Sequence, residues 1–112
     1  MTDPAELVRR FNGRITAADL DGLAALMSDD HLFVDTEGHR VASKPACVEA
    51  WGGFFAAFPG YVNTFETVDA DGAEVTVVGR SDCPGHPELT GPARWTASVA
   101  GELVRRWQVH GS

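Results

Sequence analysis

Residues 7–38 read LVRRFNGRITAADLDGLAALMSDDHLFVDTEG, and this stretch decides the fold. Leu7, Phe11 and Ile15 recur every four residues, a spacing that places apolar side chains on one face of a helix. The preceding DPAE segment supplies a capping aspartate, a proline suited to the first helical position and a glutamate able to reach back to the cap. The pattern therefore predicts an amphipathic helix from about residue 4 to 17.

A second, shorter helix and a strand follow. Asp19 is placed to cap a helix whose apolar residues fall within 20–27, and the aspartates at 29–30 are expected to end it. Residues 31–36 are short and rich in β-formers, and the Glu-Gly pair that follows supplies a turn. This order predicts a hairpin between the second helix and the next one.

Asp35 lies in the predicted strand and is the best candidate for a functional residue. Because side chains alternate across a strand, His31, Phe33 and Asp35 share one face. The carboxylate therefore has an aromatic neighbour on its own face. An aspartate at such a position can equally be a turn or cap residue, and alternation alone does not decide between the two.

The third helix has the strongest periodic pattern in the chain. Ser43 can cap it, and its apolar residues fall at spacings of four, three, one and three: Cys47, Trp51, Phe54, Phe55 and Phe58. Two glycines at 52–53 interrupt the pattern, and each costs about 1 kcal/mol relative to alanine inside a helix. Either the packing is very close there or the helix bends.

The second half of the chain has a β pattern. Four segments with turns between them make a meander: residues 61–68, 73–82, 93–99 and 103–110. We expect one α+β domain over residues 1–112, with a curved antiparallel sheet wrapped by three helices from the N-terminal half, leaving an apolar cavity. Seven aromatic residues are expected to surround this cavity and to bind its ligand: Phe11, Phe33, Trp51, Phe55, Tyr61, Trp95 and Trp107.

Composition narrows the range of partners. The chain has 112 residues, 44% of them hydrophobic, and a net charge of −7, so it offers no basic stripe for nucleic acid or for an anionic membrane. We expect a cytoplasmic protein in which Cys47 and Cys83 are free thiols. Cys83 and His86 could suggest a metal pair, but a structural zinc site needs four ligands. We expect no metal and no cofactor, and the histidines at 31, 39 and 110 at the surface or rim.

Residues 7–38 resemble the SnoaL-like and ketosteroid-isomerase-like branch of the nuclear transport factor 2-like superfamily. The helix, the DLDG start, the DD stop and the aspartate on the strand follow in the family's order. The second half agrees in pattern only, through SKPACVEAWGGFF, LTGPARW and GELVRRW. The resemblance implies a cone-shaped sheet of the cystatin-like kind. It implies no single function, since the superfamily includes isomerases, dehydratases, cyclases, epoxide hydrolases and binding modules.

In ketosteroid-isomerase-like relatives, the aspartate that falls at Asp35 is a general base, and burial in an apolar cup is expected to raise its pKa. The same relatives also have hydrogen-bond donors for the enolate oxygen at three positions of their sequence. Those positions hold Phe11, Trp51 and either Trp95 or Thr96, so steroid isomerisation by the usual machinery is not expected.

A second resemblance concerns Arg80 and Asp82, whose spacing is similar to the Arg-x-Asp pair of limonene-epoxide-hydrolase-like relatives. If the resemblance holds, the Arg80 guanidinium orients Asp82 by a hydrogen bond, and Asp82 is the acid that protonates the epoxide oxygen as the ring opens. The family's second aspartate falls near Gln108, so Asp35 would act as the base. The two side chains can equally form a solvated ion pair on the sheet surface.

Two functional hypotheses follow. In the first, the protein is an enzyme in which Asp35 transfers a proton on an apolar small molecule, in isomerase, cyclase, dehydratase or hydrolase chemistry. In the second, the same fold is a non-catalytic ligand-binding or dimerisation module. We expect a homodimer formed through the sheet in either case.

Overall fold

The computed structural model describes residues 3–110, and its first two helices begin at the predicted caps. In α1 (Pro4–Thr16), the Asp3 side chain accepts a hydrogen bond from the Ala5 backbone at 3.2 Å. In α2 (Leu20–Ala25), Asp19 accepts one from the Gly22 backbone at 3.0 Å. Each cap satisfies a backbone N–H that has no partner within its helix.

The second helix is shorter than predicted, and the following strand starts earlier. The structure places β1 at Met27–Val34, so the aspartates at 29 and 30 lie within the strand and do not end the helix. The reason is tertiary: the Leu26 carbonyl accepts a hydrogen bond from the Val104 backbone at 2.7 Å, and Met27 pairs with Val104. The chain therefore joins the sheet directly after Leu26, and a register shift between Met27 and Leu32 accommodates the aspartates.

Six strands form one curved, open sheet in the order β2-β1-β6-β5-β4-β3. The remaining strands span Arg40–Ala42 (β2), Val62–Asp71 (β3), Glu74–Asp82 (β4), Gly91–Ala100 (β5) and Leu103–His110 (β6). The sheet is antiparallel, as expected, except that β1 and β6 run parallel. The strands β2 and β3 are its two edges.

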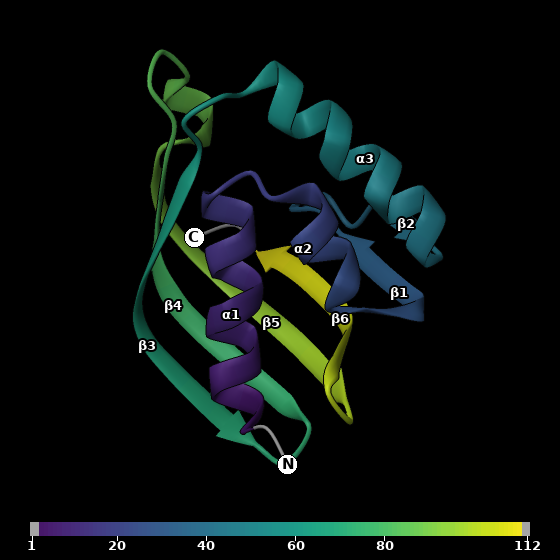
Figure 1. Ribbon diagram of the computed structural model, residues 1–112. Coiled ribbons are helices and arrows are strands. Elements are labelled where there is room, and N and C mark those ends of the chain that lie inside the picture. Colours follow the sequence, from purple (N-terminus) through teal and green to yellow (C-terminus); the bar gives the residue numbers. More distant parts are fainter. Residues whose placement is uncertain (1–2, 111–112) are drawn as a thin grey trace.

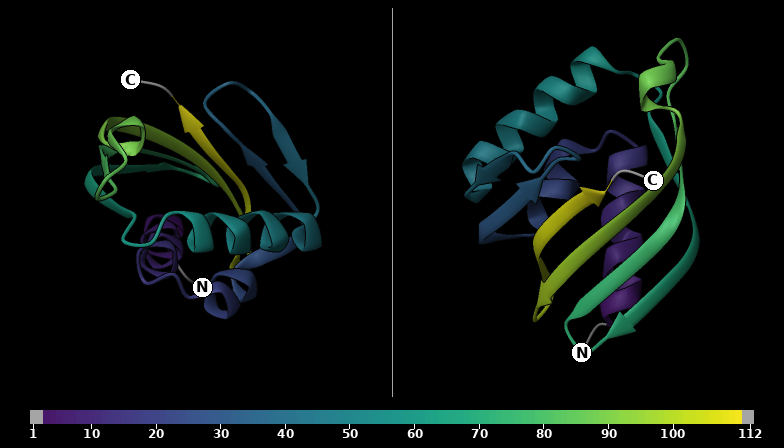
Figure 2. Two further views of the ribbon diagram at one scale, coloured as in Figure 1. Left: turned by 90° about the horizontal axis from the view of Figure 1, so that it is seen from above. Right: turned by 180° about the vertical axis from the view of Figure 1, so that it is seen from behind.

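The helices cover the concave face of the sheet, so the core lies between them (Figures 1 and 2). Along β4, Val75 and Val77 are buried on this inner face, whereas Val78 on the outer face is 44% exposed. The inner face and α1 together enclose the largest buried side chains, among them Phe11, Trp95 and Trp107. This α+β arrangement agrees with the predicted fold class. No helix within residues 3–110 is long and apolar enough to cross a membrane.

One of the two glycines of α3 (Lys44–Ala57) reflects close packing. Ser43 caps this helix by accepting from the Ala46 backbone, and the helix is unbroken over its length. A Cβ atom added at Gly52 would lie 3.3 Å from Leu20 Cδ2, tighter than an ordinary contact, whereas one at Gly53 would meet nothing within 4 Å. Gly52 thus lets α3 approach α2 closely, which decides the question left open by the sequence.

His31 lies in the core, contrary to the expectation of a surface or rim position. It is fully buried, its ring lies 5.6 Å from that of Phe11, and its Nδ1 donates to the Val104 carbonyl at 2.6 Å. Nε2 has no hydrogen-bond partner among the described residues. Burial lowers the pKa of His31, because a charged ring would lose its hydration without gaining a second partner.

The stability of the protein should therefore fall with acidity in the range where histidine titrates. The unfolded chain takes up a proton on His31 as the pH drops through 6.5, whereas the folded protein takes it up only at lower pH, so protonation favours unfolding. Urea unfolding of wild type and His31→Asn at several pH values would test this. The variant should have a lower free energy of unfolding at neutral pH. That free energy should also depend less on pH than it does in wild type, because the histidine that titrates is gone. The pKa of His110 is also lowered, so His110→Asn should remove a separate part of the pH dependence, and the comparison of the two variants assigns each part. A pH dependence of stability that is unchanged in His31→Asn would contradict the assignment.

Candidate functional site

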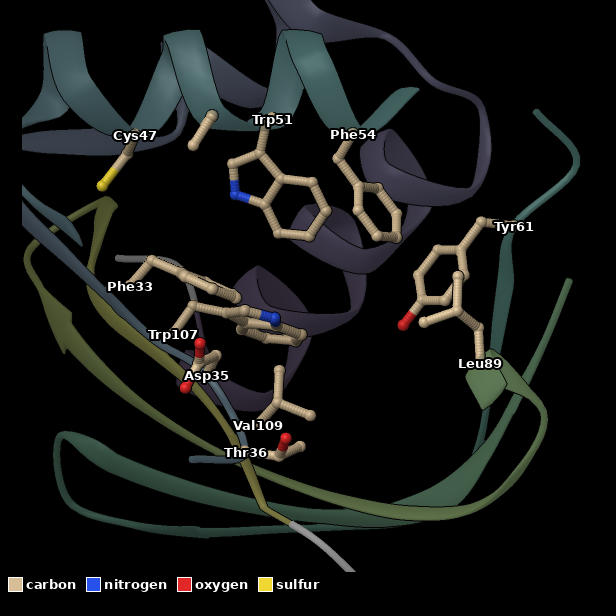
Figure 3. Close-up of a pocket in the computed structure, with 11 residues that line it drawn as sticks. Phe33, Asp35, Thr36, Cys47, Trp51, Phe54, Tyr61, Leu89, Trp107 and Val109 are labelled. Carbon is tan, nitrogen blue, oxygen red and sulfur yellow. The ribbon is translucent and has the colours of Figure 1, made fainter. Parts of the chain in front are cut away.

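The candidate site is a cavity of about 210 Å³ between α3 and the inner face of β1 and β6. Figure 3 shows Trp51 and Phe54 projecting from α3 on one side, and Phe33, Asp35 and Trp107 on the other. Tyr61 and Leu89 lie towards the far end. The lining is almost entirely apolar: Phe33, Asp35, Thr36, Cys47, Ala50, Trp51, Phe54, Tyr61, Leu89, Trp107 and Val109.

Four of the seven aromatic residues predicted to bind a ligand line this cavity: Phe33, Trp51, Tyr61 and Trp107. The other three pack behind the wall. Phe11 and Trp95 are fully buried in the core, with ring centroids 4.9 and 6.5 Å from Trp107. Phe55 packs against Trp51 at 5.6 Å. These three residues support the wall and do not line it.

The sequence reasoning did not assign six of the lining residues to the cavity: Thr36, Cys47, Ala50, Phe54, Leu89 and Val109. Periodicity could have found three of them, since Cys47 and Phe54 lie four and three residues from Trp51 on the same helix. Val109 lies two residues after Trp107 on the same strand face. Leu89 belongs to η1 (Pro87–Leu89) within a loop, where no periodic pattern exists.

Asp35 follows the last residue of β1 and lies on the cavity wall with its side chain 39% exposed. Its Oδ1 accepts from the backbone N–H groups of Glu37 and His39, each at 2.9 Å, and its Oδ2 lies 3.1 Å from His39 Nδ1. The carboxylate thus closes the turn between β1 and β2 as well as facing the cavity. The turn-closing role suggested by the sequence is therefore confirmed, whereas a catalytic role for this residue stays a prediction.

The pKa of Asp35 is lowered, contrary to the expectation that burial raises it. The largest cause is the hydrogen bond from the His39 backbone, which stabilises the charged form; the bonds from Glu37 and the His39 ring add to it, and burial opposes them. A carboxylate has about four acceptor positions, and three are used here, which leaves about one on Oδ2 for a ligand. At neutral pH the site therefore presents an ionised acceptor.

Arg80 and Asp82 lie away from the cavity. They alternate along β4 with buried residues and so project from the outer face of the sheet. Their side chains form an ion pair at 3.2 Å, and each is about half exposed. The structure therefore does not bring this pair together with Asp35. Arg80 and Asp82 form the solvated surface ion pair that was the alternative prediction.

Behind Tyr61, a chain of side-chain hydrogen bonds is buried. Ser81 Oγ donates to Asn63 Oδ1 at 2.8 Å, and the Tyr61 hydroxyl lies 3.3 Å from Ser81 Oγ. Because the single serine proton is used by Asn63, Tyr61 must be the donor to Ser81. Burial raises the pKa of Tyr61, so the phenol is neutral.

A second hollow of about 310 Å³ adjoins the cavity and shares Thr36, Tyr61, Leu89 and Val109 with it. Its remaining lining is more polar: Ser81, Glu88, Thr90, Gly91, Pro92, Ala93 and His110. The cavity alone is smaller than the roughly 300–1,000 Å³ of typical ligand sites. The second hollow gives a ligand room to extend beyond it.

Comparison with known proteins agrees with this geometry. The sequence profile described as the SnoaL-like domain matches residues 8–110, nearly the whole chain. The chain belongs to the SnoaL-like domain family. Among curated proteins, no significant match exists.

Several solved structures of this family's fold are similar to the chain. A proposed polyketide cyclase from Sinorhizobium meliloti has a TM-score of 0.82 at 18% identity, over 94% of either chain. An uncharacterised cystatin-fold protein from Novosphingobium aromaticivorans has a TM-score of 0.83 at 17% identity, over 99% of this chain and 100% of the other. An LEH-like epoxide hydrolase from M. tuberculosis has a TM-score of 0.81 at 15% identity, over 96% and 80%. At these identities the likeness establishes the fold alone.

The His39 side chain should tune the basicity of Asp35. His39→Ala removes the donor on Oδ2 but keeps both backbone donors, so the Asp35 pKa should rise towards its usual value without reaching it. Carboxyl carbon chemical shifts recorded by NMR during an acid titration would measure the change. The matched control is His86→Ala, which removes a histidine paired with Glu88. An Asp35 pKa that does not move in His39→Ala would contradict this account.

Proposed function

We propose that the protein binds an apolar small molecule in the cavity and that Asp35 accepts a proton from it as a general base. One observation carries this proposal: among the residues that line the cavity, Asp35 is the only one with a charged side chain, and the others are mostly aromatic or aliphatic. An apolar wall favours a ligand with little polarity, while one polar group can orient it.

The hydrogen bonds to Asp35 define what kind of base it can be. They keep the carboxylate ionised at neutral pH, but they also lower its affinity for a proton. Such a base suits a carbon acid that is already activated, such as a C–H group next to a carbonyl. The apolar wall limits competing hydration at the reacting atoms.

This chemistry is compatible with the isomerase, cyclase, dehydratase or epoxide-hydrolase type of reaction. A proposed polyketide cyclase and an epoxide hydrolase share the fold, which supports a catalytic role without selecting a reaction. The Arg80 and Asp82 pair takes no part in the proposal, since it lies on the outer face of the sheet.

The second candidate is ligand binding without turnover, and one observation favours it. Three of the acceptor positions of Asp35 are occupied in closing a turn, which gives the residue a structural role that needs no catalysis. In that case Asp35 would accept a hydrogen bond from the ligand and transfer no proton.

Asp35→Asn separates these two functions, because the asparagine oxygen can still close the turn but is not a base. The probe is 1-tetralone, an apolar two-ring ketone, incubated with the protein in D₂O while NMR follows deuterium uptake next to the carbonyl. Wild type should exchange this position at least tenfold faster than Asp35→Asn, and both should bind the ketone with similar affinity. The control is Asp69→Asn, the same change at an exposed position on β3.

If wild type and Asp35→Asn bind 1-tetralone but neither accelerates exchange, the general-base role is contradicted and the binding module is the better description. If neither binds the ketone, the proposed ligand class is wrong.

The expected homodimer through the sheet also stays a prediction. The outer face carries paired polar side chains, for example Ser98 and Arg106, which both donate to Glu74, and few large apolar ones. A dimer would therefore have a largely polar interface. Light scattering at micromolar concentration should give twice the mass of 12.0 kDa, and a mass of one chain would contradict the expectation. The expected cytoplasmic location stays a prediction as well.

A further inference from the structure

Three buried indole groups have no hydrogen-bond acceptor for their Nε1–H among the described residues: Trp51, Trp95 and Trp107. A buried donor without a partner loses the hydrogen bond that it made to water in the unfolded chain. Trp51 and Trp107 line the cavity and Trp95 does not. An unpaired donor that borders a cavity can regain a hydrogen bond from a ligand that reaches it.

The Trp107 indole is fully buried and held by its neighbours. Phe11, Phe65 and Trp95 pack around it with ring centroids at 4.9, 6.3 and 6.5 Å. In Figure 3 its nitrogen faces the interior of the cavity, between Trp51 and Val109, whereas the Trp51 nitrogen lies on the side of its ring away from Phe54. Because the ring is enclosed, the Trp107 N–H stays aimed at the cavity. The nitrogen itself is buried, so a ligand oxygen reaches it only when a neighbouring side chain of the wall shifts slightly.

The other donors in the wall are committed elsewhere or lie at the edge. Tyr61 donates its proton to Ser81. The Cys47 thiol donates to the Val41 carbonyl, with Sγ at 3.2 Å from the oxygen. Thr36 is exposed, and Asp35 is an acceptor only. Trp51 and Trp107 are thus the unpaired buried donors that the described residues place in the wall, and the Trp107 nitrogen is the one that faces the interior of the cavity in Figure 3.

We infer that the Trp107 Nε1–H binds an uncharged acceptor oxygen of the ligand, so that the cavity selects an apolar molecule with a carbonyl group: a ketone, an aldehyde or an ester. Indole is a donor only, so it pairs with a carbonyl oxygen and offers nothing to a hydrocarbon. The ionised Asp35 in the same wall disfavours a carboxylate ligand by charge repulsion. This inference rests on the proposed function and narrows its ligand class.

The strand register places this donor beside the proposed base. Phe33 pairs with Trp107 across β1 and β6, and Asp35 follows Phe33 by two residues towards the same side. Asp35 and Trp107 line the same cavity, so one small ligand can contact both. If Asp35 takes the proton from the carbon next to the carbonyl, the electron pair of that C–H bond forms the carbon–carbon double bond of an enolate. The π pair of the carbonyl moves onto the oxygen, where the Trp107 N–H stabilises the charge. The proton then returns to a carbon of the same molecule, and no other reactant is needed.

The experiment compares 1-tetralone with tetralin, the hydrocarbon of the same ring system, by calorimetric titration. Wild type should bind the ketone about tenfold more tightly than tetralin, the effect of one buried hydrogen bond. Trp107→Phe should abolish this preference while it still binds tetralin. The matched control is Trp95→Phe, which also removes a fully buried unpaired indole N–H, but one outside the cavity wall, and it should keep the preference.

A measurement on wild type keeps the test valid if Trp107→Phe does not fold. In a ¹H–¹⁵N NMR spectrum, 1-tetralone should move the Trp107 indole proton to lower field. In an infrared spectrum, the carbonyl stretching frequency of the bound ketone should be lower than that of the free ketone. Tetralin should leave the indole proton without this shift, because it has no acceptor.

Three outcomes would overturn the inference, and they are distinguishable from failure of the proposed function. Equal affinity for the ketone and the hydrocarbon, a preference that survives in Trp107→Phe, or a ketone complex without the indole shift would each show that Trp107 is not the donor, while the apolar cavity would still stand. Absence of binding for both probes would contradict the proposed ligand class itself, and the inference with it.

Discussion

The parallel pairing of β1 with β6 is the contact on which the site depends. It begins with the hydrogen bond between the Leu26 carbonyl and the Val104 backbone, and its register sets Phe33 beside Trp107. The same register carries Asp35 to the wall of the cavity. A shift of one residue would turn each of these side chains to the outer face, since side chains alternate along a strand. The geometry of the site is therefore maintained as long as the register between β1 and β6 is maintained.

Asp35 combines a structural and a chemical role, and the two compete. The hydrogen bonds that close the turn to His39 stabilise the charged carboxylate and so reduce its strength as a base. Deep burial would have the opposite effect, but the carboxylate lies at the edge of the cavity. In this protein the local turn outweighs the apolar surroundings. Chemistry at the site must then rely on activation of the ligand, for which a fixed donor in the wall is the natural complement.

Much of the fold could be predicted from the sequence, and the errors have physical causes. The caps at Asp3, Asp19 and Ser43 are local hydrogen bonds, and the structure confirms all three. The end of the second helix was wrong because Leu26 and Met27 pair with a strand almost eighty residues later, which no local pattern reveals. His31 was misplaced for the same reason, since its partner is the distant Val104 carbonyl.

Periodicity in the sequence by itself determined which side chains are apolar, which face of each element they share and where the helices begin, because these properties depend on residues a few positions apart. Together with the family resemblance, it also marked Asp35, Trp51 and Trp107 as candidates. Only the tertiary structure decided that Trp107 lines a cavity while Trp95 fills the core, and that Arg80 points outward. Those outcomes depend on which strands lie side by side and how the sheet curves, and both are set by contacts between residues far apart in the chain.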